Sequence, residues 1–443
     1  MERPRSETGP TVAFATLGCK VNQAETDAMA AGLARAGFRR VEFGRPADVF
    51  VINTCTVTHV ADRKSRQLVR QARRLNERAL VVATGCYAEI APDTVAELGV
   101  DVVVGNRDKD RLVDVVLGVC PTDAPPAFGA PPKSRTRAFL KVQDGCDNFC
   151  TYCIVPHARG RQRSVPLASV IAAAQAREAE GFHEVVLTGV HVGAYGRDFA
   201  TGPLAPGEDG LASPPRLADL LRAILVETAL ERVRLSSLEP EDLTPELLAL
   251  WREHPGRLCR HFHLPLQSGS DGVLHRMGRR YRTADYARLV AEVRRAVPGV
   301  AITTDLMVGF PGESEQEYAE TREFVRGMGF AGTHVFRYSS RPGTPAARLP
   351  GQVRATVTKA RSEEMLALAA AAAARFRAAL RGDVLPVLFE ERSGNGDQAR
   401  RWTGLTDNYV RVYADGQGDL TNRLLPTRLL AEEDDGLVGQ IVV

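Results

Sequence analysis

Three closely spaced cysteines, Cys146, Cys150 and Cys153, are the residues of this chain whose types and spacing point most directly to chemistry. They form a C-x3-C-x2-C set in the segment QDGCDNFCTYCIVPHARGRQRS. Cubane iron–sulfur clusters usually take four thiolate ligands, so three cysteines without a close fourth leave one iron open to another molecule. The spacing therefore predicts a reactive iron–sulfur cluster.

A zinc site is the alternative for these three cysteines. Zinc in proteins is usually held by four ligands in tetrahedral geometry, and His157, four residues after Cys153, could supply the fourth. The β/α pattern that follows the cysteines favours a catalytic centre, which structural zinc alone would not explain.

A second set of cysteines is dispersed in sequence but regular in position. Cys19, Cys55 and Cys86 each follow a predicted strand, in ATLGC, INTC and ATGC. Because the carboxyl ends of parallel strands share one edge of a sheet, we expect these thiols to meet there as a second three-ligand cluster site. Any one of them could instead be a small buried apolar residue. Cys120 and Cys259 have no such company, and we interpret them as structural.

The dispersed cysteines lie within the first of two regions in which predicted strands and helices alternate. Between residues 11 and 117, short β-branched runs alternate with helical segments at 23–37, 59–76, 92–98 and 108–117. This alternation predicts a parallel α/β sheet in a domain at residues 1–120. Residues 121–136 are rich in proline and small side chains, and we interpret them as a linker.

A second alternation begins at residue 137, directly before the closely spaced cysteines. Six strand candidates separated by helical segments predict a partial (β/α)6 barrel within a domain at 137–381, and barrel enzymes place their sites at strand ends. An alanine-rich helix ends before Gly382, and short alternating segments follow it. Residues 382–443 are therefore predicted to form a small β-barrel, and the fold class is α/β with this third domain added.

Composition limits the classes of function. The chain of 443 residues has a formal net charge of only +3, and it has no apolar run of about 18 residues, so we expect no membrane span. The polar N-terminal segment shows no secretory signal, which makes the cytoplasm the expected location and metal ligation the expected use of the cysteines. Two groups of cationic residues could contact nucleic acid or could simply be solvated helix faces: Arg63, Lys64, Arg66, Arg70, Arg73 and Arg74, and Arg276, Arg279, Arg280 and Arg282.

Taken together, these motifs resemble the methylthiotransferase family of radical S-adenosylmethionine (SAM) enzymes over nearly the whole chain. The N-terminal module is matched by TLGCKVNQAETD, VINTCTVT and TGCYAE. The radical SAM module is matched by the cysteine segment and by HLPLQSGSDGVLHRM, TTDLMVGFPGESEQEY and HVFRYSSRPGTPA, and GLTDNYVRV resembles a TRAM domain, a small RNA-associated β-barrel.

The resemblance implies the cofactors and the residues that hold them. Two [4Fe-4S] clusters are implied: one on Cys146, Cys150 and Cys153, whose open iron chelates SAM, and an auxiliary one on Cys19, Cys55 and Cys86. In this family an electron from the first cluster cleaves SAM to a 5′-deoxyadenosyl radical. At the strand ends of the barrel, SAM contacts are expected from Gly189, Glu239, Gln267 and Asp305. No catalytic residue beyond the cluster ligands is assigned.

The branch of the family indicates the substrate. Lys20, Val21 and Asn22 after the first cysteine most resemble the branch that methylthiolates C2 of N6-threonylcarbamoyladenosine beside the tRNA anticodon. Isopentenyladenosine in tRNA and an aspartate of a ribosomal protein are the alternatives within the family. Outside this reaction, a radical SAM enzyme with a relay cluster and a non-catalytic, metal-stabilised RNA-binding protein remain.

The implied partners are tRNA and an electron donor such as a flavodoxin or a ferredoxin, with no membrane; the oligomeric state is not determined. One feature departs from an RNA-binding tail: from Asp383 onward there are eleven acidic residues against six basic ones. Arg400, Arg401 and Arg411 are the candidate tRNA contacts there, and the arginines at 63–74 would supply nonspecific attraction to phosphate.

Overall fold

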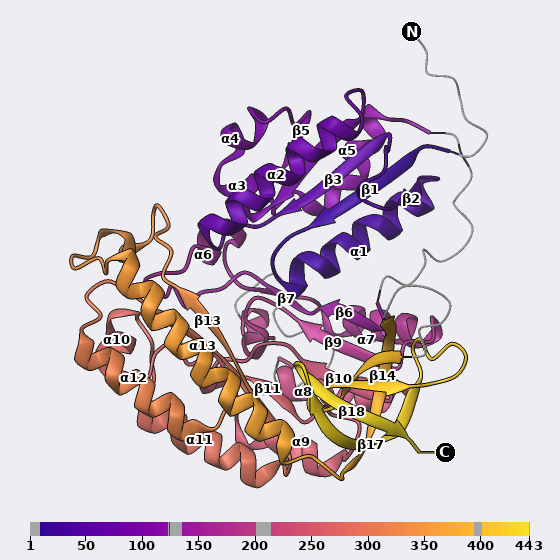
Figure 1. Ribbon diagram of the computed structural model, residues 1–443. Helices are drawn as coiled ribbons and strands as arrows, with labels where there is room; N and C mark the ends of the chain where they lie inside the picture. Colours follow the sequence, from indigo (N-terminus) through magenta and orange to yellow (C-terminus); the bar gives the residue numbers. More distant parts are fainter. Residues whose placement is uncertain (1–8, 123, 125–134, 201–213, 394–400, 443) are drawn as a thin grey trace. The chain divides into compact units, whose positions relative to one another are not determined.

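The computed structural model describes residues 9–122, 124, 135–200, 214–393 and 401–442 (Figure 1). The chain divides into two compact units. Unit 1 comprises the described parts of Met1–Ser134 together with Asp144–Arg161 and Ser339–Ala347. Unit 2 comprises Arg135–Gln143 and the described parts of Gln162–Tyr338 and Arg348–Val443.

Unit 1 is built on a five-stranded sheet in which all neighbouring strands are parallel, in the order β2-β1-β3-β4-β5. Every residue of β3 and β4 is buried, as expected for central strands covered on both faces. The strands are β1 (Thr11–Thr16), β2 (Arg39–Val41), β3 (Val49–Thr54), β4 (Leu80–Gly85) and β5 (Val102–Val104). The predicted parallel α/β sheet is confirmed.

The helices of unit 1 connect these strands. The longest, α2, begins after Thr58, whose side chain accepts a hydrogen bond from the amide of Ala61. One face of α2 is buried and the other is largely cationic. The helices are α1 (Lys20–Arg35), α2 (His59–Leu75), α3 (Cys86–Ile90), α4 (Pro92–Ala96) and α5 (Leu112–Val119), with a 3-10 turn at Lys109–Arg111.

Two segments from the middle of the sequence also belong to unit 1. The first, Asp144–Arg161, carries the closely spaced cysteines and the short helix α6 (Val155–Arg159). The short strands β7 (Gln143–Asp144) and β8 (Arg163–Ser164) border it in sequence and pair with each other. The second, Ser339–Ala347, includes most of a 3-10 turn at Pro345–Arg348. Both cysteine sets therefore lie in one compact unit.

In unit 2, two triplets of strands have the orders β6-β9-β10 and β11-β12-β13, and neighbours within each triplet are parallel. Parallel bridges between Val233 and Leu258 and between Ser237 and His263 join the two triplets. The strands are β6 (Arg137–Lys141), β9 (Glu184–Thr188), β10 (Arg232–Leu235), β11 (His261–His263), β12 (Ala301–Val308) and β13 (Gly332–Arg337). This arrangement confirms the predicted partial (β/α)6 barrel.

A large apolar core of leucine, valine and tyrosine side chains lies between these strands and the helices that follow them. Helix α13 packs against β13, as the orange ribbon in Figure 1 shows. The helices of unit 2 are α7 (Leu167–Ala179), α8 (Leu217–Glu227), α9 (Pro245–Glu253), α10 (Asp271–Arg276), α11 (Thr283–Ala296), α12 (Glu315–Met328) and α13 (Ala355–Ala378). No helix in the described parts of the chain is long and apolar enough to pass through a lipid bilayer.

The end of the chain forms a closed five-stranded barrel in the order β14-β15-β16-β18-β17, in which only the pair β16 and β18 is parallel. Its strands are β14 (Val384–Ser393), β15 (Arg401–Thr406), β16 (Arg411–Asp415), β17 (Leu424–Glu433) and β18 (Gly436–Ile441). The predicted small β-barrel is confirmed.

The predicted domain limits fall between elements. Helix α5 ends at Val119, β6 begins at Arg137, α13 ends at Ala378 and β14 begins at Val384. Most of the predicted linker, residues 123 and 125–134, lies outside the described residues. The division into domains 1–120, 137–381 and 382–443 stays a prediction.

Candidate functional site

The three dispersed cysteines of unit 1 lie at the carboxyl ends of adjacent strands. Cys19 precedes α1 after β1, Cys55 directly follows β3, and Cys86 begins α3 directly after β4. Since β1, β3 and β4 are neighbours in the sheet, the three cysteines share one edge. The three cysteines therefore lie at one edge of the sheet, as the sequence predicted.

The thiols are close enough to influence one another's ionisation. Burial raises the pKa of Cys55 to about 11; an amide hydrogen bond from Val57 opposes this, and the charges of Cys86 and Cys19 add to it. Burial also raises the pKa of Cys86. Without a bound cation the thiols of Cys55 and Cys86 stay protonated at neutral pH. A metal that binds them must displace their protons.

A glycine makes room for the central thiol. Gly18 has φ +94°, and a Cβ built on it would lie 2.9 Å from Sγ of Cys55. A side chain at position 18 would therefore collide with the edge where the cysteines meet.

A network of buried polar side chains lies beside the same edge. The amide of Asn22 donates to the carbonyl oxygen of Thr54, and Lys109 Nζ lies 2.6 Å from Glu25 Oε2. Asn106 Nδ2 lies 3.7 Å from Cys86 Sγ and donates to the carbonyl oxygen of Ala158. These contacts join the dispersed cysteines to the segment that carries the close set.

Arg159, six residues after Cys153, is a member of this network that is only 2% exposed. Its guanidinium bonds Glu25, Asp144 and Asn22. Its positive charge opposes the burial that raises the pKa of Cys86. Arg159, at the end of α6, therefore places a positive charge beside the sheet edge that carries the dispersed cysteines.

The closely spaced cysteines lie in a turn-rich segment. The amide of Cys153 donates to the carbonyl oxygen of Cys150 at 2.9 Å, and the amide of Asn148 lies 3.4 Å from Cys146 Sγ. All three cysteines are partly exposed. His157, the alternative fourth ligand, is an exposed residue of α6.

The segment Ser339–Ala347 touches the neighbours of both cysteine sets. Arg341 donates to the carbonyl oxygen of Thr56, next to Cys55, and pairs with Asp62 at 2.8 Å. The amide of Ala346 donates to the carbonyl oxygen of Thr151, next to Cys150. This segment thus helps to fix the backbone of both sets, a role that sequence reasoning missed.

In unit 2, two of the four predicted SAM contacts are neighbours. The amide of Gln267 donates to the carbonyl oxygen of Asp305 at 2.8 Å, and Gln267 has the unusual φ of +68°. Gly189 follows β9 and packs so closely on Gln143 that an added Cβ would lie 2.9 Å from its Oε1. Glu239 follows β10 and pairs with Arg279.

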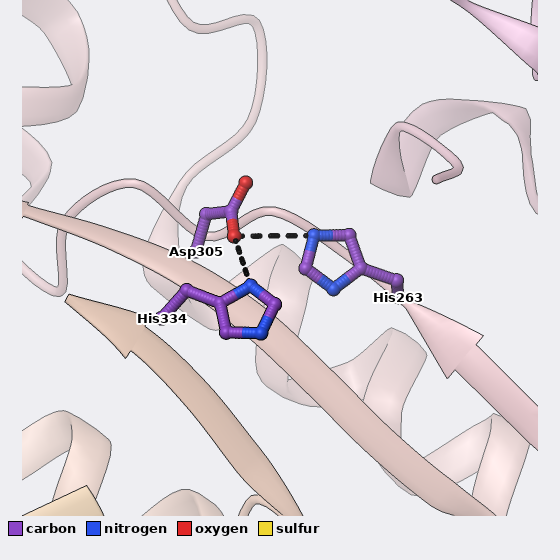
Figure 2. Close-up of side chains that lie close together, drawn as sticks. All are labelled: His263, Asp305 and His334. Carbon is purple, nitrogen blue, oxygen red and sulfur yellow. Dashed lines mark hydrogen bonds and ion pairs between the residues drawn. The ribbon is translucent and has the colours of Figure 1, made fainter. Parts of the chain in front are cut away.

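The side chain of Asp305 has partners that the sequence analysis did not single out. Its Oδ1 lies 3.2 Å from Nε2 of His263 and 3.1 Å from Nδ1 of His334. Figure 2 shows both imidazoles turned toward this oxygen. Burial raises the pKa of Asp305, but hydrogen bonds from both imidazoles outweigh this and hold the pKa well below its usual range. A sequence signal for these partners was available: two histidines stand at alternate positions in HFH, and a third stands in GTHV.

A second missed group lies at the ends of β9 and β10. Nε2 of His191 lies 2.6 Å from Oδ2 of Asp242, whose Oδ1 pairs with Arg197. Gly193 lies so close to Asp242 that an added Cβ would overlap it. This group braces two strand ends of the barrel.

The predicted groups of cationic residues differ in how many of their charges are paired with carboxylates. In the second group, Arg276 pairs with Glu317 and Arg279 pairs with Glu239, whereas Arg280 and Arg282 are exposed. In the first group, four residues of α2 are exposed: Arg63, Lys64, Arg70 and Arg74. In the C-terminal barrel, Arg401 pairs with Glu433 and Arg411 lies 3.6 Å from Asp435, whereas Arg400 lies outside the described residues.

Two family models match the chain. Uncharacterized protein family UPF0004 matches residues 11–105, and the radical SAM superfamily matches residues 140–325. The first covers the dispersed cysteines, and the second covers the close set and all four strand-end residues predicted to contact SAM.

Curated relatives are similar over almost the whole chain. A Bacillus subtilis protein named threonylcarbamoyladenosine tRNA methylthiotransferase MtaB is 38% identical over 95% of this chain and 94% of its own length. A Thermotoga maritima protein of the same name is 38% identical over 86% of each chain. A Sorangium cellulosum protein named tRNA-2-methylthio-N(6)-dimethylallyladenosine synthase is 36% identical over 93% of this chain and 89% of its own.

A solved structure shares the fold. The radical SAM methyltransferase TsrM from Kitasatospora setae, solved with tryptophan and the SAM analogue aza-SAM, superposes with a TM-score of 0.55 at 17% identity, covering 76% of this chain and 75% of its own. From the identity and coverage of the curated relatives, the chain belongs to the radical SAM methylthiotransferase family.

Proposed function

We propose that this protein transfers a methylthio group to C2 of N6-threonylcarbamoyladenosine beside the anticodon of tRNA. The observation that carries the proposal is the pair of three-cysteine sets within one compact unit, in a chain 38% identical to a relative named for that reaction. A cluster with three protein ligands keeps an iron open, which a simple electron relay does not need.

The two cysteine sets are the proposed cluster ligands. Cys146, Cys150 and Cys153 would hold the cluster that binds SAM, and Cys19, Cys55 and Cys86 the auxiliary cluster. Three thiols on one edge, with Gly18 leaving space beside Cys55 Sγ, fit a three-ligand cluster. When bound and reduced, the SAM cluster would cleave SAM to the radical that removes hydrogen from the substrate carbon. Sulfur associated with the auxiliary cluster would be inserted there and methylated by a second SAM.

The protein's own residues bind and orient SAM in this proposal. Gly189 allows the backbone to approach the cofactor, while Glu239 and Gln267 offer a carboxylate and an amide. Asp305 stays ionised because its pKa is held low, so its second oxygen, Oδ2, is a hydrogen-bond acceptor at neutral pH. A closed, positioned site is needed because a primary radical reacts with whatever it meets first.

The exposed cationic residues of α2 are the proposed tRNA contact in unit 1. They would bind phosphates without reading sequence, which makes tRNA affinity salt-dependent. The compensated Arg401 and Arg411 are weaker candidates. A flavodoxin or ferredoxin is the proposed electron donor, and the cytoplasm, where tRNA is modified, is the proposed location.

Iron counting tests the cluster assignment first. The chain is reconstituted anaerobically with iron and sulfide as wild type, as a Cys146/Cys150/Cys153 triple alanine and as a Cys19/Cys55/Cys86 triple alanine. We expect about eight irons in wild type and about half in each variant, with SAM cleavage lost only when the close set is removed. About four irons in wild type, unchanged without Cys19, Cys55 and Cys86, would overturn the methylthiotransferase reaction.

Product analysis tests the substrate. Each of two tRNAs, one carrying threonylcarbamoyladenosine and one carrying dimethylallyladenosine, is incubated with the enzyme, SAM and a reductant, and its nucleosides are analysed by mass spectrometry. We expect the methylthio product from the first only. A product from the second would favour the reaction named for the Sorangium cellulosum relative, and modification of a ribosomal protein instead of tRNA would favour the remaining alternative.

A further inference from the structure

We propose that His263, Asp305 and His334 form a binding site for one divalent transition-metal ion, distinct from both cysteine sets. All three residues lie in unit 2, whereas the six predicted cluster cysteines lie in unit 1. Each residue offers one ligand atom, and these atoms all lie within 4.8 Å of one another. Nε2 of His263 and Nδ1 of His334 are the ring nitrogens that face Oδ1 of Asp305.

The strand register brings these side chains to one face of the sheet. Asp305 of β12 is paired in register with His334 of β13, and His263 of β11 is paired with Thr303, two residues before Asp305. Because side chains alternate along a strand, Thr303 and Asp305 face the same side, and His263 and His334 flank them. Three hydrogen-bonded strands hold the group more rigidly than a loop would.

The distances fit a shared ion. Two ligand atoms about 2.0–2.1 Å from one metal ion, subtending about 90–110°, are about 2.8–3.4 Å apart. Asp305 Oδ1 lies 3.2 Å from His263 Nε2 and 3.1 Å from His334 Nδ1 (Figure 2). The side chain of His334 is 67% exposed, so its imidazole can turn toward an ion without disturbing the core.

The chemistry of the donor set selects the class of ion. Two imidazoles and one carboxylate, with further positions open, are typical of sites for zinc, iron(II) and manganese(II). Magnesium and calcium prefer oxygen ligands alone.

The surroundings of His263 match those of a metal-bound histidine. Metal-ligating imidazoles usually make a hydrogen bond through the second ring nitrogen, which fixes the ring. Nδ1 of His263 lies 3.0 Å from Oγ1 of Thr303, and the same hydroxyl lies 3.0 Å from Nε2 of His261. The ring of His263 is thereby oriented with Nε2 toward Asp305.

The second oxygen of Asp305 is left for another role. Oδ2 makes no hydrogen bond with any residue that the structure describes. Coordination through Oδ1 therefore leaves Oδ2 available to the SAM contact proposed for Asp305, and the two assignments are compatible.

Equilibrium dialysis tests the site. The reconstituted full-length enzyme is washed with EDTA and dialysed against ZnCl2 or MnCl2, and the metal bound per chain is measured separately from iron. Wild type is compared with His334→Ala, Asp305→Asn and His275→Ala. His275 is an exposed histidine of α10 and serves as the matched control. Far-UV circular dichroism checks that each variant is folded.

We expect about one Zn2+ or Mn2+ per wild-type chain beyond the iron, with an affinity at least about tenfold lower in His334→Ala and Asp305→Asn and unchanged in His275→Ala. Because His334 is exposed, its replacement removes a ligand without opening the core. The site is refuted if wild type and His334→Ala bind both metals equally, or if His275→Ala loses as much metal as His334→Ala.

Discussion

The guanidinium of Arg159 lies 3.0 Å from the carboxylate of Glu25, a residue 134 positions earlier in the chain. Only 1% of the Arg159 side chain and 7% of the Glu25 side chain are exposed. Asp144 and Lys109 complete the group, with two positive and two negative charges. Charges so deeply buried are tolerated only when each is paired, so this contact ties the α6 segment to helix α1 of unit 1.

Replacing Arg159 by methionine should destabilise the protein strongly. Glu25 and Asp144 would keep their burial but lose a partner, and breaking a buried pair typically costs about 3–5 kcal/mol. Arg159→Lys keeps the charge but not the forked geometry, so a smaller loss is expected. The midpoint of urea unfolding measures both.

Arg161→Ala is the control for Arg159. It removes an ion pair with Asp147 from the same segment, but the Arg161 side chain is 77% exposed. An exposed pair contributes about 1 kcal/mol or less. Equal shifts of the urea unfolding midpoint in Arg159→Met and Arg161→Ala would contradict the special role of Arg159.

Arg341→Gln should lower the stability of unit 1 and its retention of iron at the dispersed cysteines. The change removes the guanidinium from Oδ2 of the buried Asp62, which keeps its hydrogen bond from Thr56 Oγ1 on the other oxygen, and it removes the donor to the carbonyl oxygen of Thr56, beside Cys55. Iron per chain after reconstitution and the unfolding temperature are the measurements. The exposed Arg337→Gln is the control.

Replacing both Asp62 and Arg341 tests whether Arg341→Gln acts through the lost ion pair or through a general packing defect. The double variant Asp62→Asn/Arg341→Gln should regain part of the stability that Arg341→Gln loses, because no buried charge is left alone. A double variant that is less stable by the sum of both single changes would argue against this account.

Gly145→Ala should disrupt the closely spaced cysteines, whereas Gly160→Ala should not. Both glycines have positive φ, +69° and +77°. A Cβ on Gly145 would lie 2.1 Å from the carbonyl oxygen of Arg161, while a Cβ on Gly160 would meet no atom within 4 Å. The second change costs only backbone strain of about 1–2 kcal/mol.

Iron content and SAM cleavage after reconstitution check this pair of glycine variants. Loss of about half the iron in Gly145→Ala, with near-normal iron in Gly160→Ala, is expected. If both variants lose iron equally, backbone strain rather than the collision governs the loop.

The ion pair of Glu317 with Arg276 should make stability depend on pH. Hydrogen bonds from Arg276 outweigh burial and lower the pKa of Glu317 to about 2, below the value of about 4.3 expected in the unfolded chain. A carboxyl with a lowered folded-state pKa contributes fully above its unfolded pKa and loses that contribution as the pH falls toward its folded pKa.

Wild type should therefore exceed Glu317→Gln in unfolding temperature at pH 7, and the difference should shrink between about pH 5 and pH 3. Glutamine keeps an oxygen that can accept the capping hydrogen bond from the amide of Ser314, so the comparison isolates the charge. A difference that stays constant over this range would disprove the effect.

Much of the candidate site followed from the sequence because strand ends are periodic features. Cys19, Cys55 and Cys86 each follow a buried β-branched run, and a parallel sheet leaves such positions on one edge. The alternation also predicted the barrel, with Gln267 and Asp305 at its strand ends. These inferences need only local patterns and a rule of topology.

Other predictions depended on contacts that no local pattern contains. Arg276 and Arg279 look like a basic surface in the sequence, but Glu317 and Glu239 compensate them after folding. The histidines around Asp305 were missed because register, rather than spacing, brings His334 beside it.

The sequence by itself determined the family, the alternation of strands and helices, and the six cysteines whose spacing fits two three-ligand clusters. Tertiary structure alone decided which charges are buried together, that Ser339–Ala347 supports both cysteine sets, and that two imidazoles share the oxygen of Asp305. The reason is physical: hydrophobic periodicity is written along the chain, whereas side-chain pairs between distant segments exist only once the core has packed and fixed their distances.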